Sequence, residues 1–135
     1  MLQRHGASLV IVFVLAFIAN IAWEFLHAVL YVHYQGKEIS DFILIRAALF
    51  DASFITLLAL PMLMVPFLRA RLWIALVAGV VFAVLLEWFA LTTGRWMYTD
   101  SMPIIPIIKT GLTPTIQLGC ISWGVLILVR RYIHK

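Results

Sequence analysis

Residues 20–31, "NIAWEFLHAVLY", end an apolar run that covers about residues 8–32. A helix needs roughly 20 mostly apolar residues to cross the hydrocarbon core of a bilayer, so this run is long enough to span a membrane. The quoted stretch nevertheless contains an amide, a carboxyl group and an imidazole, from Asn20, Glu24 and His27. Such groups are costly in hydrocarbon, so their surroundings must compensate for them.

The composition of the whole chain indicates a membrane environment. Of its 135 residues, 64% are hydrophobic and 12% are charged, and the mean hydropathy is +1.07. A soluble domain of this length could not cover so much apolar surface with so few charged side chains. We therefore predict an integral membrane protein. The single cysteine, Cys120, excludes an intrachain disulfide and a cysteine-based metal cage.

The apolar runs predict an all-α integral membrane protein whose four transmembrane helices form a compact bundle, in one domain over residues 1–135. The expected helices cover about residues 8–32, 42–66, 72–91 and 113–129. The first run is longer than the core of a signal peptide, so we interpret it as a span. Residues 92–112 include "MPIIPII", which is too rich in proline for a continuous helix and too apolar for a solvated loop. We expect this segment to be interfacial or re-entrant.

The basic residues predict the orientation in the membrane. One side of the expected bundle carries basic residues without any acidic residue, and these are Arg4, Arg69, Arg71, Arg130, Arg131 and Lys135. Cytoplasmic loops are enriched in such residues, so we expect a multi-pass protein of the inner (plasma) membrane with cytoplasmic N- and C-termini. The net charge of +4 then reflects topology and contact with membrane lipids. We expect no nucleic-acid partner.

The polar residues of the expected helices lie at similar depths. Asn20, Glu24, His27 and Tyr31 are spaced four, three and four residues apart, so they share one face of a helix. Counted from the helix ends, this group and three residues of the other helices, Asp51, Glu87 and Gln117, fall in the outer half of the membrane. The sequence therefore predicts that polar groups from all four helices meet there.

One face of the third expected helix is made of small residues. Ala75, Gly79, Ala83 and Glu87 follow one another every four residues. Small side chains allow helices to approach closely in a membrane, so this face should pack against another helix. The spacing then directs Glu87 into the bundle.

These positions predict an acid–base pocket that opens toward the outer leaflet. The candidate catalytic residues are Glu24, His27, Asp51 and Glu87, with Glu24 and Glu87 as proton donor and acceptor and the other two adjusting them. The candidate residues for binding substrate or a lipid head group are Asn20, Tyr31, Arg95, Trp96, Tyr98 and Gln117. Arg95 closes the site in this interpretation, either by pairing with Glu87 or by binding an anionic head group. A network that only holds the helices together, with an aromatic and basic anchor at the surface, is the structural alternative.

The spacing of Glu24 and His27 also raises the question of a metal. A Glu-x-x-His pair occurs on the helices of carboxylate-bridged di-metal bundles, but those sites use two such pairs and two further glutamates. This chain has one pair, together with Glu87 and Asp51. We therefore predict no cofactor, and a metal held by Glu24, His27 and Glu87 is the weaker alternative.

The pattern of Glu87, "TGRWMY" (93–98), "MPIIP" (102–106) and "GLTPTIQ" (111–117) resembles a group of small bacterial four-span membrane proteins with no established activity. Part of it is also similar to membrane-embedded carotenoid hydratases and cyclases, which have a helix-borne glutamate, a Thr-Gly pair, a tyrosine and a proline-containing loop. That resemblance carries over to Glu87, Gly94 and Tyr98 and implies a polyisoprenoid substrate. Those enzymes are larger, and the rest of their pattern has no clear counterpart here.

The leading functional hypothesis is an isomerase, hydratase or cyclase acting on an apolar lipid or polyisoprenoid. A proton or small-ion transport protein formed by oligomers is a second hypothesis, because intramembrane carboxyl groups also suit ion pathways. An accessory subunit of a larger membrane complex is a third. A homo-oligomer remains open in each case.

Overall fold

The computed structural model describes residues 2–133, with side-chain surroundings for residues 6–132. Its elements are α1 (Leu2–His27), the 3-10 helix η1 (Ala28–Leu30), β1 (Tyr31–Tyr34), α2 (Asp41–Met64), α3 (Pro66–Arg69), α4 (Trp73–Thr92), β2 (Trp96–Tyr98) and α5 (Leu112–Ile133). Four helical segments are long and apolar enough to cross a membrane, and these are Gly6–Leu30, Asp41–Met64, Trp73–Thr92 and Leu112–Tyr132. The prediction of a mostly helical fold with four candidate spans is confirmed.

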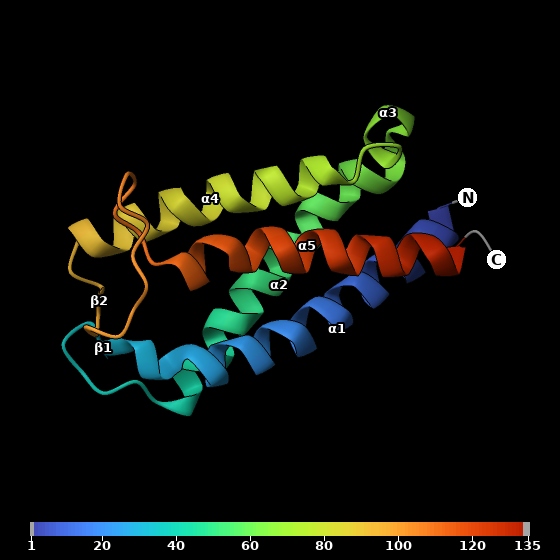
Figure 1. The fold of residues 1–135 in the computed structure, drawn as a ribbon. Coiled ribbons are helices and arrows are strands. Elements are labelled where there is room, and N and C mark those ends of the chain that lie inside the picture. The colour runs from blue at the N-terminus through green and yellow to red at the C-terminus, as the bar shows by residue number, and fades with distance from the viewer. Residues whose placement is uncertain (1, 134–135) are drawn as a thin grey trace.

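The four long helices are arranged as two pairs. α1 packs along α2, and α4 packs along α5. Figure 1 shows that α2 and α4 lie close together near α3, the short helix that connects them, and diverge toward the opposite end. A continuous apolar core fills the part near α3 and includes Val12, Ile55, Met62 and Leu126. The divergence leaves room between the two pairs at the other end.

Two glycines bring α4 and α5 into backbone contact. A Cβ atom placed on Gly79 would lie 2.6 Å from the Cα atom of Gly119. A Cβ atom on Gly119 would lie 2.5 Å from the backbone oxygen of Leu76. The buried face of α4 consists of Ala75, Gly79, Ala83, Glu87 and Ala90, as the four-residue spacing predicts. Close packing of this face therefore fixes the direction of Glu87.

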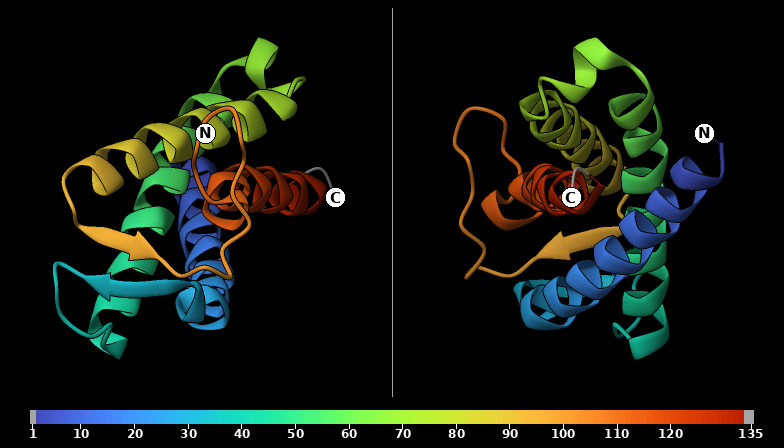
Figure 2. Two further views of the ribbon diagram at one scale, coloured as in Figure 1. Left: turned by 60° about the vertical axis from the view of Figure 1, so that its left-hand side comes forward. Right: turned by 90° about the vertical axis from the view of Figure 1, so that its right-hand side faces the viewer.

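A short antiparallel ribbon corrects the all-α prediction. α1 ends at His27, earlier than the expected end near residue 32, and the chain continues through η1 into β1. Tyr31 pairs with Tyr98 of β2, and Tyr34 pairs with Trp96. Figure 2 shows the two strands side by side across one end of the bundle. Tyr31 therefore does not continue the helical face of Asn20, Glu24 and His27. The aromatic and β-branched residues of "YVHY" favour a strand when a partner strand is available.

A glycine turns the chain from α4 into β2. Gly94 has a φ of +67°, in the left-handed region that glycine adopts without strain. The backbone N–H of Arg95 donates to the carbonyl of Ala90 at 2.9 Å, which closes the helix end as in a Schellman motif. This turn places β2 directly beside Glu87, although Trp96 follows Glu87 by nine residues in the chain.

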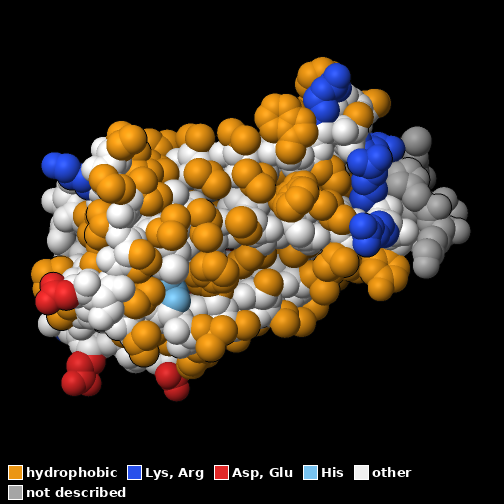
Figure 3. Space-filling view, viewed as in Figure 1, with side chains coloured by type: hydrophobic (Ala, Val, Ile, Leu, Met, Phe, Trp, Pro, Cys, Tyr) orange, Lys and Arg blue, Asp and Glu red, His pale blue; other side chains and the backbone are white. Residues whose placement is uncertain are grey.

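Charged side chains gather at the two ends of the bundle. Figure 3 shows most of the visible Lys and Arg at the end near the chain termini, acidic side chains together with some basic side-chain surface at the opposite end, and hydrophobic side chains along the length between them. The basic end includes Arg69 of α3 together with Arg130 and Arg131 of α5. The side chain of Arg4 and the whole of Lys135, which also support the predicted orientation, lie outside the described parts of the structure.

The close contact between Gly79 and Gly119 should make the stability of the protein sensitive to a larger side chain at Gly79. Gly79→Ala should lower the free energy of unfolding by about 1–3 kcal/mol, because the new methyl group meets backbone atoms that cannot move independently. Gly124→Ala on α5 is the matched control, since nothing lies within 4 Å of a Cβ there. Unfolding in mixed detergent micelles measures both variants. Equal stability of the two would contradict the close packing.

Candidate functional site

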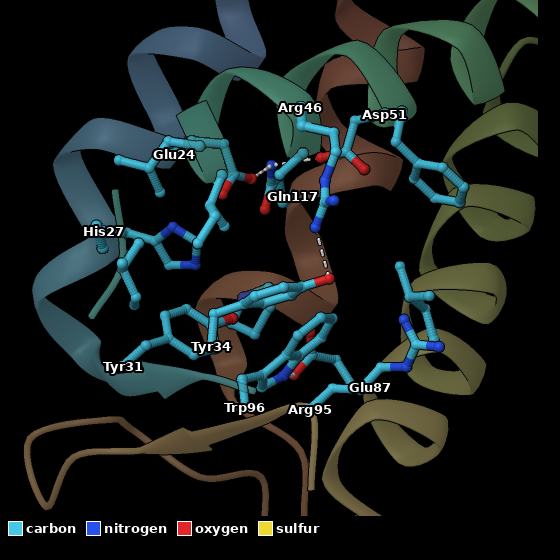
Figure 4. Close-up of a pocket in the computed structure, with 18 of the residues that line it drawn as sticks. Glu24, His27, Tyr31, Tyr34, Arg46, Asp51, Glu87, Arg95, Trp96 and Gln117 are labelled. Atoms are coloured by element: carbon cyan, nitrogen blue, oxygen red, sulfur yellow. Dashed lines mark hydrogen bonds between the residues drawn. The ribbon is translucent and has the colours of Figure 1, made fainter. Parts of the chain in front are cut away.

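A cavity of about 460 Å³ lies between the two helix pairs at their diverging ends. Every long helix and the ribbon contribute to it: its polar lining residues are Glu24, His27, Tyr31, His33, Tyr34, Gln35, Arg46, Asp51, Glu87, Arg95, Trp96 and Gln117. Figure 4 shows the labelled side chains around this space. Phe50, which also lines the cavity, is 50% exposed, so the cavity opens at the surface beside α2.

Gln117 is the centre of a polar cluster in the cavity wall. Its Nε2 atom donates to Oε1 of Glu24 at 2.8 Å, to Oδ2 of Asp51 at 3.0 Å and to Oδ1 of Asn20 at 3.0 Å. An amide nitrogen has two hydrogens, so three acceptors share two donors. Asn20 in turn donates to the backbone oxygen of Ala16 at 2.8 Å. The cluster therefore connects α5 to both α1 and α2, as Figure 4 shows for the two carboxyl groups.

Glu87 has separate partners on the ribbon. Its Oε2 atom accepts a hydrogen bond from Nε1 of Trp96 at 3.3 Å and a second, short one from the Tyr98 hydroxyl. The Tyr98 oxygen itself accepts from the backbone N–H of Gly111 at 3.0 Å. Glu87 is 4% exposed, so these donors replace water for its carboxyl group. Of the two roles expected for Arg95, the ion pair with Glu87 does not form, since Arg95 lies instead over the ring of Phe89, and the binding of a head group stays a prediction.

The ribbon covers the outer end of the cavity with aromatic rings. The ring centroids of Tyr31 and Trp96 are 6.1 Å apart, and those of Tyr34 and Trp96 are 6.4 Å apart. Burial raises the pKa of the Tyr98 phenol above its ordinary range, and its hydrogen bond to Glu87 acts in the same direction. Burial also raises the pKa of Tyr31, and the nearby carboxyl group of Glu87 adds to the effect. Both phenols therefore remain hydrogen-bond donors at neutral pH.

The two ring nitrogens of His27 are buried without a hydrogen-bond partner of standard geometry among the described residues. The residue is 8% exposed, and neither ring nitrogen makes a hydrogen bond of standard geometry within the described residues, although the backbone of Trp23 is close. Its ring packs against that of Tyr31, with centroids 5.2 Å apart. Glu24, which shares a face of α1 with His27, accepts a hydrogen bond from Gln117 instead. His27 thus presents at the cavity buried nitrogen atoms that no described group satisfies with standard hydrogen-bond geometry.

Four polar lining residues were not predicted as site residues from the sequence, and these are His33, Tyr34, Gln35 and Arg46. Arg46 donates from Nη2 to the hydroxyl of Tyr34 at 2.7 Å, and its guanidinium group lies 5.3 Å from the centre of the same ring. A signal was present for Arg46, because it falls inside the expected span 42–66, where a charged residue indicates function by default. Nothing local distinguishes Tyr34 from an ordinary residue of the membrane interface.

The segment between β2 and α5 folds against an exposed side of α4 that carries Trp88. Trp88 donates from its indole nitrogen to the backbone oxygen of Ile108 at 2.7 Å. Residues 104 and 111 form an isolated antiparallel bridge, and Met102 is buried beneath it. Ile107 at the tip is 93% exposed. The segment is therefore a folded excursion with an apolar tip, and the interfacial or re-entrant character expected for residues 92–112 stays a prediction.

Metal-binding groups and similarity to known proteins are two further sources of information on the site. Among the described residues, no group of three or more His, Cys, Asp or Glu side chains has the arrangement of a metal site. In comparisons with protein-family models, curated proteins and solved structures, nothing matches the chain.

Removal of the shared amide should destabilise the fold. Gln117→Leu leaves two carboxyl groups and the Asn20 oxygen without their donor, and we expect a loss of about 1–3 kcal/mol in the free energy of unfolding. Ser122→Ala is the control on the same helix, because the buried Ser122 hydroxyl makes no hydrogen bond within the described residues. If both variants unfold alike in detergent titrations, Gln117 does not hold the helices together.

The raised pKa values of Tyr31 and Tyr98 predict an unusual alkaline titration. A raised pKa means that the folded protein favours the neutral phenol, a stabilisation that is complete below about pH 10 and lost as the pH rises through the raised pKa. In the folded protein, Tyr31→Phe and Tyr98→Phe should leave the ultraviolet phenolate signal between about pH 9 and 11 unchanged. In the denatured chain each substitution should reduce it. A reduction in the folded state would contradict the burial of these phenols.

Proposed function

We propose that this protein is a membrane-embedded enzyme that performs proton transfer on an apolar lipid or polyisoprenoid, as an isomerase, hydratase or cyclase. It lies in the inner (plasma) membrane with both termini in the cytoplasm, and the cavity faces the outer leaflet. The basic end of the bundle supports this orientation, because the described arginines at that end have no acidic residue near them in the sequence.

The observation that supports this proposal most strongly is the hydrogen bonding of the three carboxyl groups in the cavity. Glu24, Asp51 and Glu87 come from three different helices, and each uses one oxygen for hydrogen bonds to the protein. The second oxygen of each has no hydrogen-bond partner among the described residues. A network whose only role is to join helices would gain from engaging both oxygens. One held oxygen and one open oxygen instead orient a carboxyl group for proton transfer to a ligand.

The residues divide into two groups with complementary roles. Glu87 accepts from two neutral donors on the ribbon, which suits the base. Glu24 and Asp51 share the single amide of Gln117, and two carboxyl groups that share one neutral donor are best accommodated when one of them holds a proton. In this proposal Glu24 donates the proton, Asp51 and His27 adjust it, and Glu87 with Tyr98 accepts the proton lost from the substrate.

The shape of the cavity supports a lipid substrate. The rings of Phe54 on α2 and Phe82 on α4 stack with centroids 4.1 Å apart. Farther from α3, residues of both helices line the cavity, among them Ile43, Phe50 and Leu86. An apolar chain can enter sideways from the bilayer between these helices. The apolar core on the other side of the phenylalanine stack lacks a described polar path, which favours an enzyme over an ion pathway through one copy of the chain.

The proposal predicts deuterium uptake from solvent. Isomerisation, hydration and cyclisation of an alkene each form a C–H bond with a proton from an exchangeable acid, so lipids treated with the protein in D₂O should gain deuterium. The protein is reconstituted in nanodiscs with the lipid extract of its own host membrane, and mass spectrometry measures the mass shift. Glu24→Gln and Glu87→Gln should each reduce uptake by at least about 100-fold.

A matched substitution controls for the loss of a carboxyl group. Glu38→Gln changes an exposed residue between β1 and α2 and should retain full uptake. Uptake that is absent with the unaltered protein contradicts acid–base chemistry at carbon. Uptake that survives in Glu24→Gln or Glu87→Gln contradicts the roles assigned to these residues.

A further inference from the structure

Charges of both signs line the cavity but do not pair with each other. The three carboxyl groups are bound by neutral donors, from Gln117, Trp96 and Tyr98. The two arginines of the cavity, Arg46 and Arg95, form no ion pair with a described residue. Opposite charges at the edge of a membrane attract strongly when they are within reach. An arrangement that keeps both arginines free of carboxyl groups leaves their charge available to a ligand.

Arg46 is held in place by an aromatic residue. Its Nη2 atom donates to the Tyr34 hydroxyl, and the guanidinium group lies over the Tyr34 ring. A guanidinium group has five N–H donors, and one of them is used here. Figure 4 shows the side chain reaching from α2 to Tyr34 at the edge of the cavity. Arg46 is thus oriented while most of its donors remain free.

Arg95 is held in place by its backbone. It follows Gly94 in the turn that closes α4, where its N–H donates to Ala90, and its carbonyl oxygen accepts from the N–H of Gln35. Its guanidinium group lies 5.0 Å from the centre of the Phe89 ring. The side chain is exposed and lines the same cavity as Arg46. The two arginines therefore line one cavity, with Arg46 on α2 and Arg95 directly before β2.

We propose that the ligand of this cavity carries an anionic phosphate head group, which Arg46 and Arg95 bind at the outer rim. Guanidinium groups match the geometry of phosphate oxygens, and two of them can neutralise a phosphate monoester. The apolar chain of the ligand then extends between α2 and α4 past Ile43, Phe50 and Leu86. This inference rests on the proposed function only for the reaction, since binding of the head group needs no turnover.

The proposed position of the head group determines which part of the ligand meets the carboxyl groups. The arginines are exposed, whereas Asp51 and Glu87 are buried at 7% and 4% exposure. A phosphate at the rim places the first carbons of the attached chain near these buried carboxyl groups. The same arrangement suits an isoprenoid phosphate and a phospholipid, because both join a phosphate at the interface to an apolar chain.

Paired probes that differ only in the phosphate test this inference. Binding to the full-length protein in detergent micelles is measured by tryptophan fluorescence, with geranylgeranyl phosphate against geranylgeraniol and dioleoyl phosphatidic acid against dioleoylglycerol. In at least one pair, the phosphate form should bind about tenfold or more tightly than the alcohol. Arg46→Gln and Arg95→Gln should each reduce that advantage, and the double substitution should abolish it.

Arg131→Gln is the matched control. It removes one positive charge from the last turn of α5, at the end of the helix away from the cavity, and should leave the tighter binding of the phosphate form intact. A phosphate advantage in the isoprenoid pair or in the diacyl pair identifies the source of the head group, and either result supports the inference. No advantage in both pairs overturns it, as does an equal loss in Arg131→Gln. Folding of each variant is checked by its melting temperature. An intact advantage without deuterium uptake would overturn the proposed reaction while leaving the head-group site standing.

Discussion

The side-chain amide of Gln117 is the polar contact between the two helix pairs. It reaches from α5 to Glu24 and Asn20 on α1 and to Asp51 on α2. Within each pair, the two helices pack along each other. Between the pairs, a buried amide that finds three acceptors fixes both the distance and the rotation of the helices, because any other arrangement would leave polar atoms unpaired in an apolar environment. Gln117, Glu24 and Asp51 line the cavity, so the depth of the cavity depends on the position of these side chains.

The position of the cavity at one end follows from the sizes of the side chains along the helices. Near the middle of α4, Gly79 allows the backbone of α5 to approach as closely as atoms permit. The stacked rings of Phe54 and Phe82 separate α2 from α4 at a similar level. α4 is thus held against α5 on one side and held away from α2 on the other. Beyond the ring stack the two helices diverge, and the polar residues occupy the space that results.

Much of this arrangement was predictable from the sequence, for specific reasons. Helix length and hydropathy indicate the spans, because a bilayer imposes a minimum length on every crossing. The four-residue spacing of Ala75, Gly79, Ala83 and Glu87 predicted the buried face of α4, since small residues mark close packing. The shared depth of Glu24, Asp51, Glu87 and Gln117 predicted that these residues line one space. All four line the cavity, so their predicted proximity is confirmed.

The ribbon could not be predicted in the same way. β1 and β2 are separated by two spans, each is too short for its alternation to be recognised, and Tyr31 also fits the helical spacing that precedes it. Because the ribbon was missed, so were the donors to Glu87 and the separation of Arg95 from that residue. Hydrogen bonds between residues far apart in the sequence depend on the tertiary fold, and a single sequence carries no local sign of them.

The hydrogen bonds of the ribbon couple the cover of the cavity to Glu87. Tyr98 donates to the carboxyl group and accepts from Gly111, so β2, the start of α5 and α4 meet at one phenol oxygen. A displacement of β2 that opened the outer end would remove both donors from Glu87 and leave a buried carboxyl group unpaired. The closed ribbon is therefore the state in which Glu87 is both buried and oriented. Under the proposed function, an apolar chain that entered between α2 and α4 would leave this state undisturbed, so the side of the bundle would be a less costly route than its end.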